Sequence, residues 1–251
     1  MILSSSSKNL FALHLIIFIM TIAGFYYVDF SISNILTCLI FFYLYSVFGV
    51  SLTLHRFYSH KTFVFKHSIL KWLFTFVSLI SCRGSVLGWV YIHRIHHAHA
   101  DTKLDPHSPH NNHIGFLGSV HLFMNTPKIN PFVVKDLLGS FHIWVDRYYI
   151  GILILWGIVL TLLGYNILYF AWLLPICIVH ITQNCFNYFA HKHGYRNIET
   201  KDRSTNCILL WPFILGDAWH NNHHSIASNY SSKIKWWEFD PLVLFINVVR
   251  R

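Results

Sequence analysis

The sequence predicts an all-α integral membrane protein with four transmembrane helices in two hairpins, interfacial helices and a cytosolic helical cap. Of its 251 residues, 54% are hydrophobic and only 12% are charged, whereas soluble domains carry about 25% charged residues. Long runs contain no Asp, Glu, Lys or Arg, and the basic residues are confined to segments between these runs. These features exclude a water-soluble enzyme. We expect residues 1–251 to form a single domain.

Two charge-free runs predict the first hairpin. Residues 10–28 and 32–54 contain 19 and 23 residues, and they reach roughly 29 and 35 Å at about 1.5 Å per helical residue. Each helix can therefore cross a bilayer. The polar residues 4–8 before the first run also fit a signal peptide, but no small-residue cleavage site follows, so we expect the run to be kept as a span.

A third apolar block predicts the second hairpin. Residues 148–191 are 44 residues without formal charge, which is enough for two spans, and Gly164-Tyr165-Asn166 supplies a turn. We expect these spans at about 148–164 and 167–190. The cytosolic cap would then consist of residues 55–147 and 191–251.

The 19 Lys and Arg residues indicate which ends of the spans face the cytosol. One precedes the first span, ten lie in residues 56–147, eight lie in residues 192–251, and none lies in the two short turns. By the positive-inside rule, both termini and both large polar segments are cytosolic. The net charge of +9 therefore indicates a multi-pass topology and contact with membrane lipid, and we expect no nucleic-acid partner.

Two features predict elements at the membrane surface. Residues 72–81 form an apolar run of ten between Lys71 and Arg83, too short to cross a bilayer, which predicts a helix lying on or dipping into the interface. Trp236 and Trp237, next to lysines, predict interfacial anchoring by tryptophan, with a further interfacial helix as the alternative.

Histidines form three clusters in the cytosolic segments. The clusters are His55-Arg56-Phe57-Tyr58-Ser59-His60, His93-Arg94-Ile95-His96-His97 and His220-Asn221-Asn222-His223-His224. The last two have HxxHH spacing, and because positions i, i+3 and i+4 share a helix face, we expect each to present three imidazoles to one point. His55 and His60 are five residues apart, which does not fit one face of an α-helix and predicts that the second span bends or ends there.

Asn187 and His191 add a further pair, spaced i, i+4 at the cytosolic end of the fourth span. Nine histidines and one asparagine can then converge above the membrane. A zinc ion takes four ligands, so nine imidazoles predict two metal ions with four or five ligands each, and therefore a dimetal site in the cap. Iron, zinc, copper and nickel all bind neutral imidazole, so the ligands alone leave the metal open.

Other metal sites fit the sequence less well. A structural zinc site would use fewer ligands and typically cysteines, but the five cysteines show no CxxC spacing. Haem held by two histidines needs them in facing spans, where only His14 and His180 lie. Glu199 and Glu238 are the only glutamates and neither lies between histidines, which excludes an HExxH metalloprotease and a carboxylate-bridged di-iron bundle.

The three histidine clusters and the Asn187–His191 pair are called boxes below. With these boxes on four predicted spans, the chain resembles the integral-membrane fatty acid desaturases, in the delta-9 branch of acyl-CoA and acyl-lipid enzymes. The resemblance covers residues 49–237 and rests on HRFYSH, HRIHH, NYFAH and HNNHH in the family's order. It implies a di-iron (Fe) centre with Asn187 bound through a water. It also implies nine histidine ligands, which are His55, His60, His93, His96, His97, His191, His220, His223 and His224.

Further matches to the family lie between the boxes. Asp105-Pro106-His107 follows the second box, and Gly216-x-x-Trp219 leads into the last one. We expect Asp101 and Asp105 to accept hydrogen bonds from ligand imidazoles and so to fix their orientation, with a simple turn at Asp105-Pro106 as the alternative.

The resemblance also predicts residues of an apolar substrate tunnel. Trp89 lies four residues before the second box, and Tyr43 lies twelve residues before His55 in the second span, roughly 18 Å below it at helical rise. Tyr43 matches a family position near the end of the tunnel. An ordinary packing aromatic is the alternative for Tyr43.

The implied reaction removes two vicinal hydrogens from a saturated acyl chain and forms a cis double bond while O2 is reduced with two external electrons. The electrons would come from a separate donor such as ferredoxin or cytochrome b5. An unactivated methylene has no acidic proton and no leaving group, so iron is preferred among the metals. HNNHH and Tyr91-Ile92 resemble the cyanobacterial and plant enzymes, and acyl-CoA and acyl-lipid substrates both stay open. The alternatives are a lipid hydroxylase or oxygenase on the same scaffold, and a non-catalytic membrane metal-binding protein.

Overall fold

The structure is a computed structural model that describes residues 7–106, 108–110 and 129–251. Within these ranges the chain is helical, and its β pairing consists of isolated bridges such as that between Tyr195 and Asn206. The elements are α1 (Ser7–Gly24), α2 (Ile32–Tyr43), η1 (Leu44–Ser59), α3 (Ser68–Ile80), α4 (Val86–His99), η3 (Lys135–Leu137), α6 (Ser140–Leu163), α7 (Tyr165–Leu168), η4 (Tyr169–Leu173), α8 (Leu174–Phe189), η5 (Ile208–Leu210), α9 (Trp211–Ile214), η6 (Leu215–Ala218), α10 (His220–Ser225) and α11 (Pro241–Val249).

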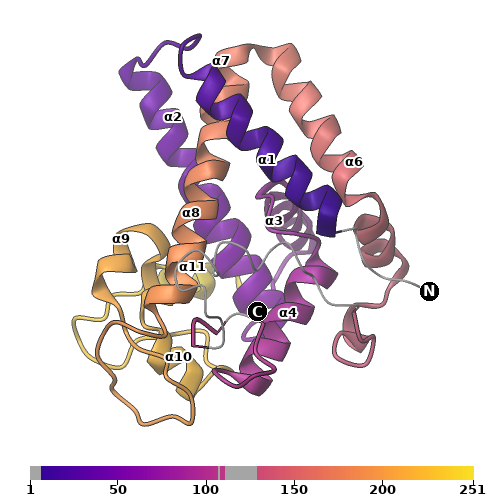
Figure 1. Cartoon of the computed structure of the whole chain (residues 1–251). Coiled ribbons are helices and arrows are strands. Elements are labelled where there is room, and N and C mark those ends of the chain that lie inside the picture. The colour runs from indigo at the N-terminus through magenta and orange to yellow at the C-terminus, as the bar shows by residue number, and fades with distance from the viewer. Residues whose placement is uncertain (1–6, 107, 111–128) are drawn as a thin grey trace.

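The long helices form one bundle. Figure 1 shows α1, α2, α6 and α8 side by side, with α4, α9 and α10 at one end of them. α1 packs against α6 and α8, and α2 packs against α8. The turn between α1 and α2 and the turn at Gly164 lie at the other end of the bundle (Figure 1). The chain therefore forms the two helical hairpins that its turns predicted.

In the part of the chain that the structure describes, three helical stretches are long and apolar enough to cross a membrane. They are Ile32–Ser59, Ser140–Leu163 and Tyr165–Phe189. The first expected span is shorter, because its apolar helix covers Leu10–Gly24 and the predicted extension to residue 28 is wrong. Residues 25–31 instead form the turn into α2, whose first turn is capped by the Ser31 hydroxyl as it accepts a hydrogen bond from the Asn34 amide.

The helix α6 begins eight residues before the predicted span at 148–164. The prediction stopped at the charged residues Asp146 and Arg147, yet both lie inside α6. The Asp146 carboxylate is buried and accepts a hydrogen bond from the Ser85 hydroxyl at the start of α4. This partner offsets the cost of burying the carboxylate, so the charge does not end the helix.

The short apolar run after the second span forms the separate helix α3. Its C-terminal end is buried, where the Tyr149 hydroxyl donates to Leu79 O at 3.1 Å and Trp172 Nε1 donates to Ile80 O at 2.9 Å. These bonds satisfy carbonyl groups that a helix end leaves without partners. The start of α3 is open, since Ile69 is 72% exposed. The helix therefore dips into the bundle with its C-terminal end.

Trp236 and Trp237 lie in a turn, so the alternative of a second interfacial helix at this place is wrong. The Glu238 carboxylate accepts hydrogen bonds from the backbone amides of Ile234 and Lys235, at 2.8 and 2.7 Å, and these bonds fold the segment back on itself. Both indole rings are exposed. Interfacial anchoring by these rings stays a prediction.

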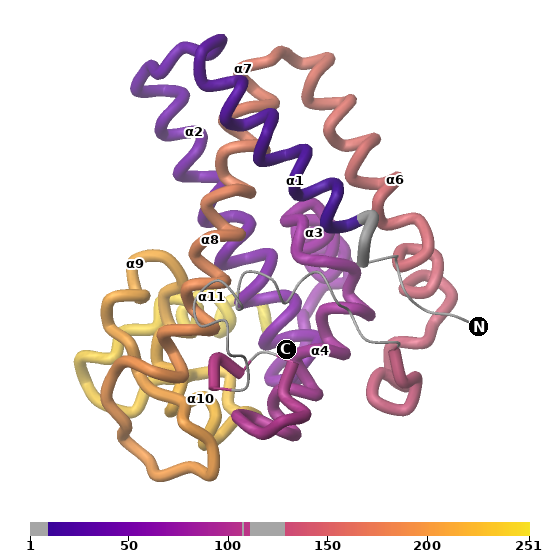
Figure 2. Tube along the Cα trace, viewed as in Figure 1, coloured from indigo at the N-terminus to yellow at the C-terminus, as the bar shows by residue number. Residues whose placement is uncertain are grey.

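Residues 32–59 form one helix whose second half, η1, is π-wound. Figure 2 shows its trace running down from the bundle beside α8, against which both halves pack. The His60 amide donates to His55 O at 3.1 Å, and the Ser59 hydroxyl donates to Leu54 O at 2.8 Å. The helix ends at Ser59, close to the predicted place. The five-residue spacing of the histidines has a different origin, because bonds between residues five apart define a π-helix and bring such residues to one face.

Candidate metal centre

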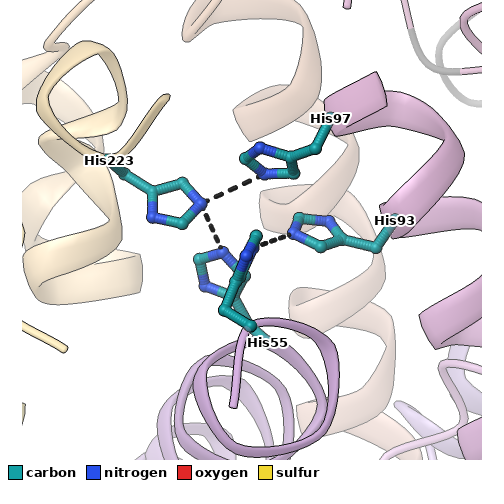
Figure 3. Close-up of side chains that lie close together, drawn as sticks. His55, His93, His97 and His223 are labelled. Atoms are coloured by element: carbon teal, nitrogen blue, oxygen red, sulfur yellow. Dashed lines mark hydrogen bonds between the residues drawn. The ribbon is translucent and has the colours of Figure 1, made fainter. Parts of the chain in front are cut away.

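The predicted site residues come from four parts of the fold. His55 and His60 lie at the end of η1, His93, His96 and His97 lie on α4, Asn187 and His191 lie at the end of α8, and His220, His223 and His224 lie on α10. Figure 3 shows His55, His93, His97 and His223 pointing toward one another from three of these elements. The fold thus joins side chains as far apart in the sequence as His55 and His223, whose Nε2 atoms are 2.9 Å apart.

The nine histidines divide into two groups, and in each group one ring nitrogen of every member lies within 4.8 Å of the others. The five-histidine group is His55, His60, His93, His97 and His223, and the four-histidine group is His96, His191, His220 and His224. This division matches the expectation of four or five imidazoles for each of two metal positions.

Each HxxHH box supplies both groups, so the expectation that a box presents three imidazoles to one point is wrong. In both boxes the first and last histidines join one group and the middle histidine joins the other. The middle residue of the α4 box, His96, belongs to the four-histidine group, and that of the α10 box, His223, belongs to the five-histidine group. Successive residues of an α-helix are about 100° apart, so positions i and i+4 nearly overlie each other while position i+3 points to a different side. Each helix therefore contributes to both groups.

The spacing of the ring nitrogens fits a shared cation in each group. The Nε2 atoms are 2.9 Å apart between His55 and His223, and 3.1 Å apart between His191 and His220. Imidazole nitrogens bind zinc at about 2.1 Å, so two of them at right angles around one ion of this size are about 3.0 Å apart. The donor set therefore fits two transition-metal ions.

The opposite ring nitrogen, Nδ1, contacts an aspartate in the two places where the sequence predicted one. Nδ1 of His96 lies 2.9 Å from Asp105, and Nδ1 of His191 lies 2.9 Å from Asp101. A carboxylate only accepts, so Nδ1 carries the proton and the Nε2 lone pair faces the group. Asp105 also accepts from the Asp101 amide, so the segment is a turn as well. His107, the last residue of the matched motif, lies outside the described residues.

Sequence reasoning missed two further aspartates with the same role. Asp217 lies 3.2 Å from Nδ1 of His55, and Asp202 lies 2.8 Å from Nδ1 of His224. Asp217 stands three residues before the last box, between the Gly and Trp that the family resemblance singled out, and this position was a usable signal. Asp202 lies in a loop with no regular spacing to any box, so the sequence gave no signal for it.

The protonation states suit metal binding. Burial and the neighbouring histidines hold the pKa of His220 and of His223 well below the usual range, so both rings are neutral near pH 7. Burial alone would raise the pKa of the Asp202 carboxyl, but the hydrogen bond from His224 holds its pKa well below the usual range. The site therefore combines neutral imidazoles with ionised carboxylates behind them.

A cavity of about 40 Å³ lies beside both groups. Its lining residues are Val50, His55, Arg83, Trp89, His93, His96, Gln183, Phe186, Asn187, Asp217 and His220. This volume holds about one to three waters, so a water-bridged role for Asn187 is sterically possible and stays a prediction. Trp89 stacks on His93 with ring centroids 4.8 Å apart, which places its indole at both the histidine group and the cavity wall.

Three other side chains considered from the sequence lie away from the histidine groups. The Tyr43 hydroxyl donates to Pro212 O at 2.7 Å, and the residue is 36% exposed. The rings of His14 and His180 are in contact, with centroids 4.7 Å apart. Nε2 of His14 lies 2.7 Å from Cys82 O and Nδ1 of His180 lies 3.1 Å from Arg83 Nη1, so both rings are held by other partners, which disfavours the haem alternative.

The two asparagines of the last box, Asn221 and Asn222, anchor α10. Asn222 Nδ2 donates to the buried carboxylate of Glu238 at 2.8 Å, and its Oδ1 accepts from Asn206 at 2.9 Å. The Asn221 side-chain oxygen accepts from the Asn197 amide at 2.9 Å. These hydrogen bonds hold α10, the helix that carries three of the histidines, against the neighbouring loops.

A buried charge network anchors the other side of the site. Arg56 Nη2 lies 3.0 Å from Asp217 and 3.0 Å from Asp240, and Asp217 contacts His55. Gly216 packs directly on Asp240, and a Cβ at Gly216 would overlap its carboxylate. The requirement for glycine in Gly216-x-x-Trp219 thus has a steric cause.

Gly216→Ala is expected to lower the free energy of unfolding by about 1–3 kcal/mol, because the methyl group would push the Asp240 carboxylate away from Arg56. Thermal unfolding in detergent, followed by tryptophan fluorescence, measures the change. Gly151→Ala in α6 is the matched control, since nothing lies within 4 Å of a Cβ there. Equal melting temperatures for the two variants would contradict the prediction.

Comparisons with known proteins identify the family to which this chain belongs. Residues 31–243 match the family model described as "Fatty acid desaturase". The sn-1 stearoyl-lipid 9-desaturase of Anabaena variabilis is 31% identical over 223 residues, which cover 84% of this chain and 79% of that protein. The sn-2 palmitoyl-lipid 9-desaturase of Nostoc sp. is 33% identical over 79% of this chain and 72% of that protein, and the sn-1 stearoyl-lipid 9-desaturase of Synechocystis sp. is 31% identical over 76% and 61%. This chain therefore belongs to the fatty acid desaturase family, in the branch that contains the 9-desaturases.

Proposed function

We propose that this chain is a membrane fatty acid desaturase that inserts a cis double bond at position 9 of a saturated acyl chain, using O2, two external electrons and two iron ions. One observation carries the proposal: five and four imidazoles form adjacent groups beside one small cavity. The 9-desaturases among its relatives support the position of the double bond.

The proposed ligands are the nine histidines and, through a water, Asn187. Iron bound there would supply the oxidising chemistry that an unactivated methylene requires. The acyl chain loses two hydrogens, and O2 with these hydrogens, two electrons and two protons gives two waters. The protein's own residues hold and orient. The aspartates would fix the imidazoles, and Trp89, Val50 and Phe186, the apolar side chains on the cavity wall, would place the reacting part of the acyl chain beside the histidines and exclude water.

We place the protein in the membrane as a multi-pass protein of one domain, residues 1–251, with α1, α2–η1, α6 and α7–α8 as its four spans. The 18 residues of α1 reach about 27 Å, close to the thickness of the hydrocarbon core. The short turns without basic residues lie away from the end of the bundle that carries α4 and α10 (Figure 1), and these two helices belong to the basic sequence segments 56–147 and 192–251. By the positive-inside rule, the histidines and both termini are cytosolic.

The relatives support a proposal for the substrate class, and the chemistry of the reaction requires an external electron donor. Acyl-lipid and acyl-CoA enzymes both occur among the relatives, for example the acyl-CoA C20 Delta5-desaturase of Anemone leveillei, 28% identical over 88% of this chain and 72% of that protein. We propose an acyl-lipid or acyl-CoA substrate and a separate donor of the ferredoxin or cytochrome b5 type. Membrane lipid surrounds the spans.

The test is expression in a host that lacks this desaturation, followed by fatty-acid methyl ester profiling with location of the double bond. A product two hydrogens lighter, with a cis bond at position 9, is the expected result. A product heavier by one oxygen would instead identify a hydroxylase. Bound metal with an unchanged lipid profile would identify a non-catalytic metal-binding protein.

Tyr43→Ala is expected to lengthen the preferred acyl chain, because a bulky ring at the end of the tunnel would limit chain length. Profiling of the products from a mixture of saturated chains measures this preference. Tyr43→Phe is the control, since it keeps the ring and removes only the hydrogen bond to Pro212. An unchanged chain-length preference in Tyr43→Ala would assign Tyr43 to packing against that segment.

A further inference from the structure

The four aspartates that contact histidine Nδ1 atoms are divided unequally between the two groups. Behind the four-histidine group stand Asp105 on His96, Asp101 on His191 and Asp202 on His224, at 2.8–2.9 Å. Behind the five-histidine group stands Asp217 on His55, at 3.2 Å. All ten Asp and Glu residues of the sequence lie in the described ranges, so the comparison leaves out none of these carboxylate side chains.

The difference in charge is larger than the difference in number. Asp217 is shared with Arg56, whose guanidinium lies 3.0 Å from it, so its charge is largely offset. The side chains of Asp101, Asp105 and Asp202 are at most 12% exposed, and water therefore screens their charges little. Three carboxylates, each at most 12% exposed, thus stand behind the histidines of one metal position, and one carboxylate that is shared with an arginine stands behind those of the other.

A carboxylate that accepts from Nδ1–H makes the imidazole a stronger donor and stabilises the higher charge on the bound ion. We infer that the two metal positions are electronically unequal, with the iron of the four-histidine group at the lower reduction potential and therefore oxidised first. This inference rests on the proposed function, since it requires an iron ion in each group. The inference goes beyond the proposed function because it states which of the two iron ions loses its electron first.

The experiment uses the full-length protein in detergent, loaded with 57Fe and reduced, with two irons per chain checked by metal analysis. Ferricyanide is added anaerobically, and each equivalent takes one electron from one ferrous ion and becomes ferrocyanide. Mössbauer spectra count the ferrous and ferric ions, and a redox titration gives the two midpoints. The wild type is expected to oxidise in two separate one-electron steps.

Asp202→Asn keeps an acceptor oxygen for His224 but removes the charge. It is expected to raise the lower midpoint potential by at least about 59 mV more than the upper one. This corresponds to a tenfold change in the ratio of the two one-electron equilibrium constants. Asp217→Asn is the matched control and is expected to raise mainly the upper midpoint. Asp105→Asn, on His96, repeats the test at a second residue of the four-histidine group, in case Asp202→Asn does not fold.

The following results would contradict the inference that the two metal positions are electronically unequal. A single two-electron step in the wild type, or equal shifts of both midpoints in Asp202→Asn and Asp105→Asn, would overturn the inference and leave the proposed function intact. A wild-type protein that binds fewer than two irons under these conditions would overturn both. A purely structural role of the aspartates would lower metal content without shifting one midpoint relative to the other.

Discussion

His96→Ala is expected to lower formation of the desaturated product by more than about 100-fold, since the loss of a partner behind a metal ligand alone typically costs 10–100-fold in metal affinity or activity. His96 belongs to the four-histidine group, and its removal also leaves Asp105 buried without its imidazole. Metal content should fall together with product. Fatty-acid methyl ester profiling of the expression host and metal analysis of the purified variant measure the two effects.

The matched control for this substitution is His99→Ala. His99 lies on the same helix, α4, three residues further on and outside both histidine groups. It tests whether loss of any histidine from this helix lowers expression or folding. Full product from His96→Ala, at the level of His99→Ala, would remove the assignment of these histidines as metal ligands.

The long apolar helices were largely predictable, because helices that face lipid must avoid charge and long charge-free runs are typical of them. The ends of the helices were less predictable, because a charge can stay inside a helix when the fold supplies a partner. Asp146 shows this: its contact with Ser85, from another helix, is invisible in the local sequence, and α6 begins at Ser140. The histidine spacing of the first box likewise depends on the π winding of η1, which sequence periodicity did not reveal.

The nine histidines that the fold brings together could be predicted, but their division into two groups could not. Spacing within a box predicted three histidines on one helix face, whereas the middle histidine of each HxxHH box joins the other group. Which group it joins depends on how α4 and α10 face each other. Asp101 and Asp105 lie near a box and were expected, while Asp202 comes from a distant loop. Glu238 was visible only as a rare glutamate, and its hydrogen bond to Asn222 needed the fold.

Arg56→Ala is expected to destabilise the protein by about 3–5 kcal/mol, because it leaves two carboxylates buried without their cation. The Arg56 side chain is 3% exposed, lies 3.0 Å from both Asp217 and Asp240, and also donates to Tyr230 O at 2.9 Å. Arg56→Lys should restore only part of this stability, since a single ammonium group cannot reproduce the planar fork that meets both carboxylates. Thermal unfolding in detergent gives the ranking of the variants.

Lys61→Ala is the control, because it breaks the ion pair with Asp136 in which Lys61 is 59% exposed, and such pairs contribute at most about 1 kcal/mol. If Arg56→Ala lost no more stability than Lys61→Ala, the buried charge network would not be needed to stabilise the fold.

Arg56→Ala is also expected to change the reduction potentials of the two metal positions. Without Arg56, the full charge of Asp217 would act on His55, so the upper midpoint should fall toward the lower one, opposite to the effect of Asp217→Asn. The thermal stability of the protein and its upper midpoint potential would then both report on the charge of Arg56.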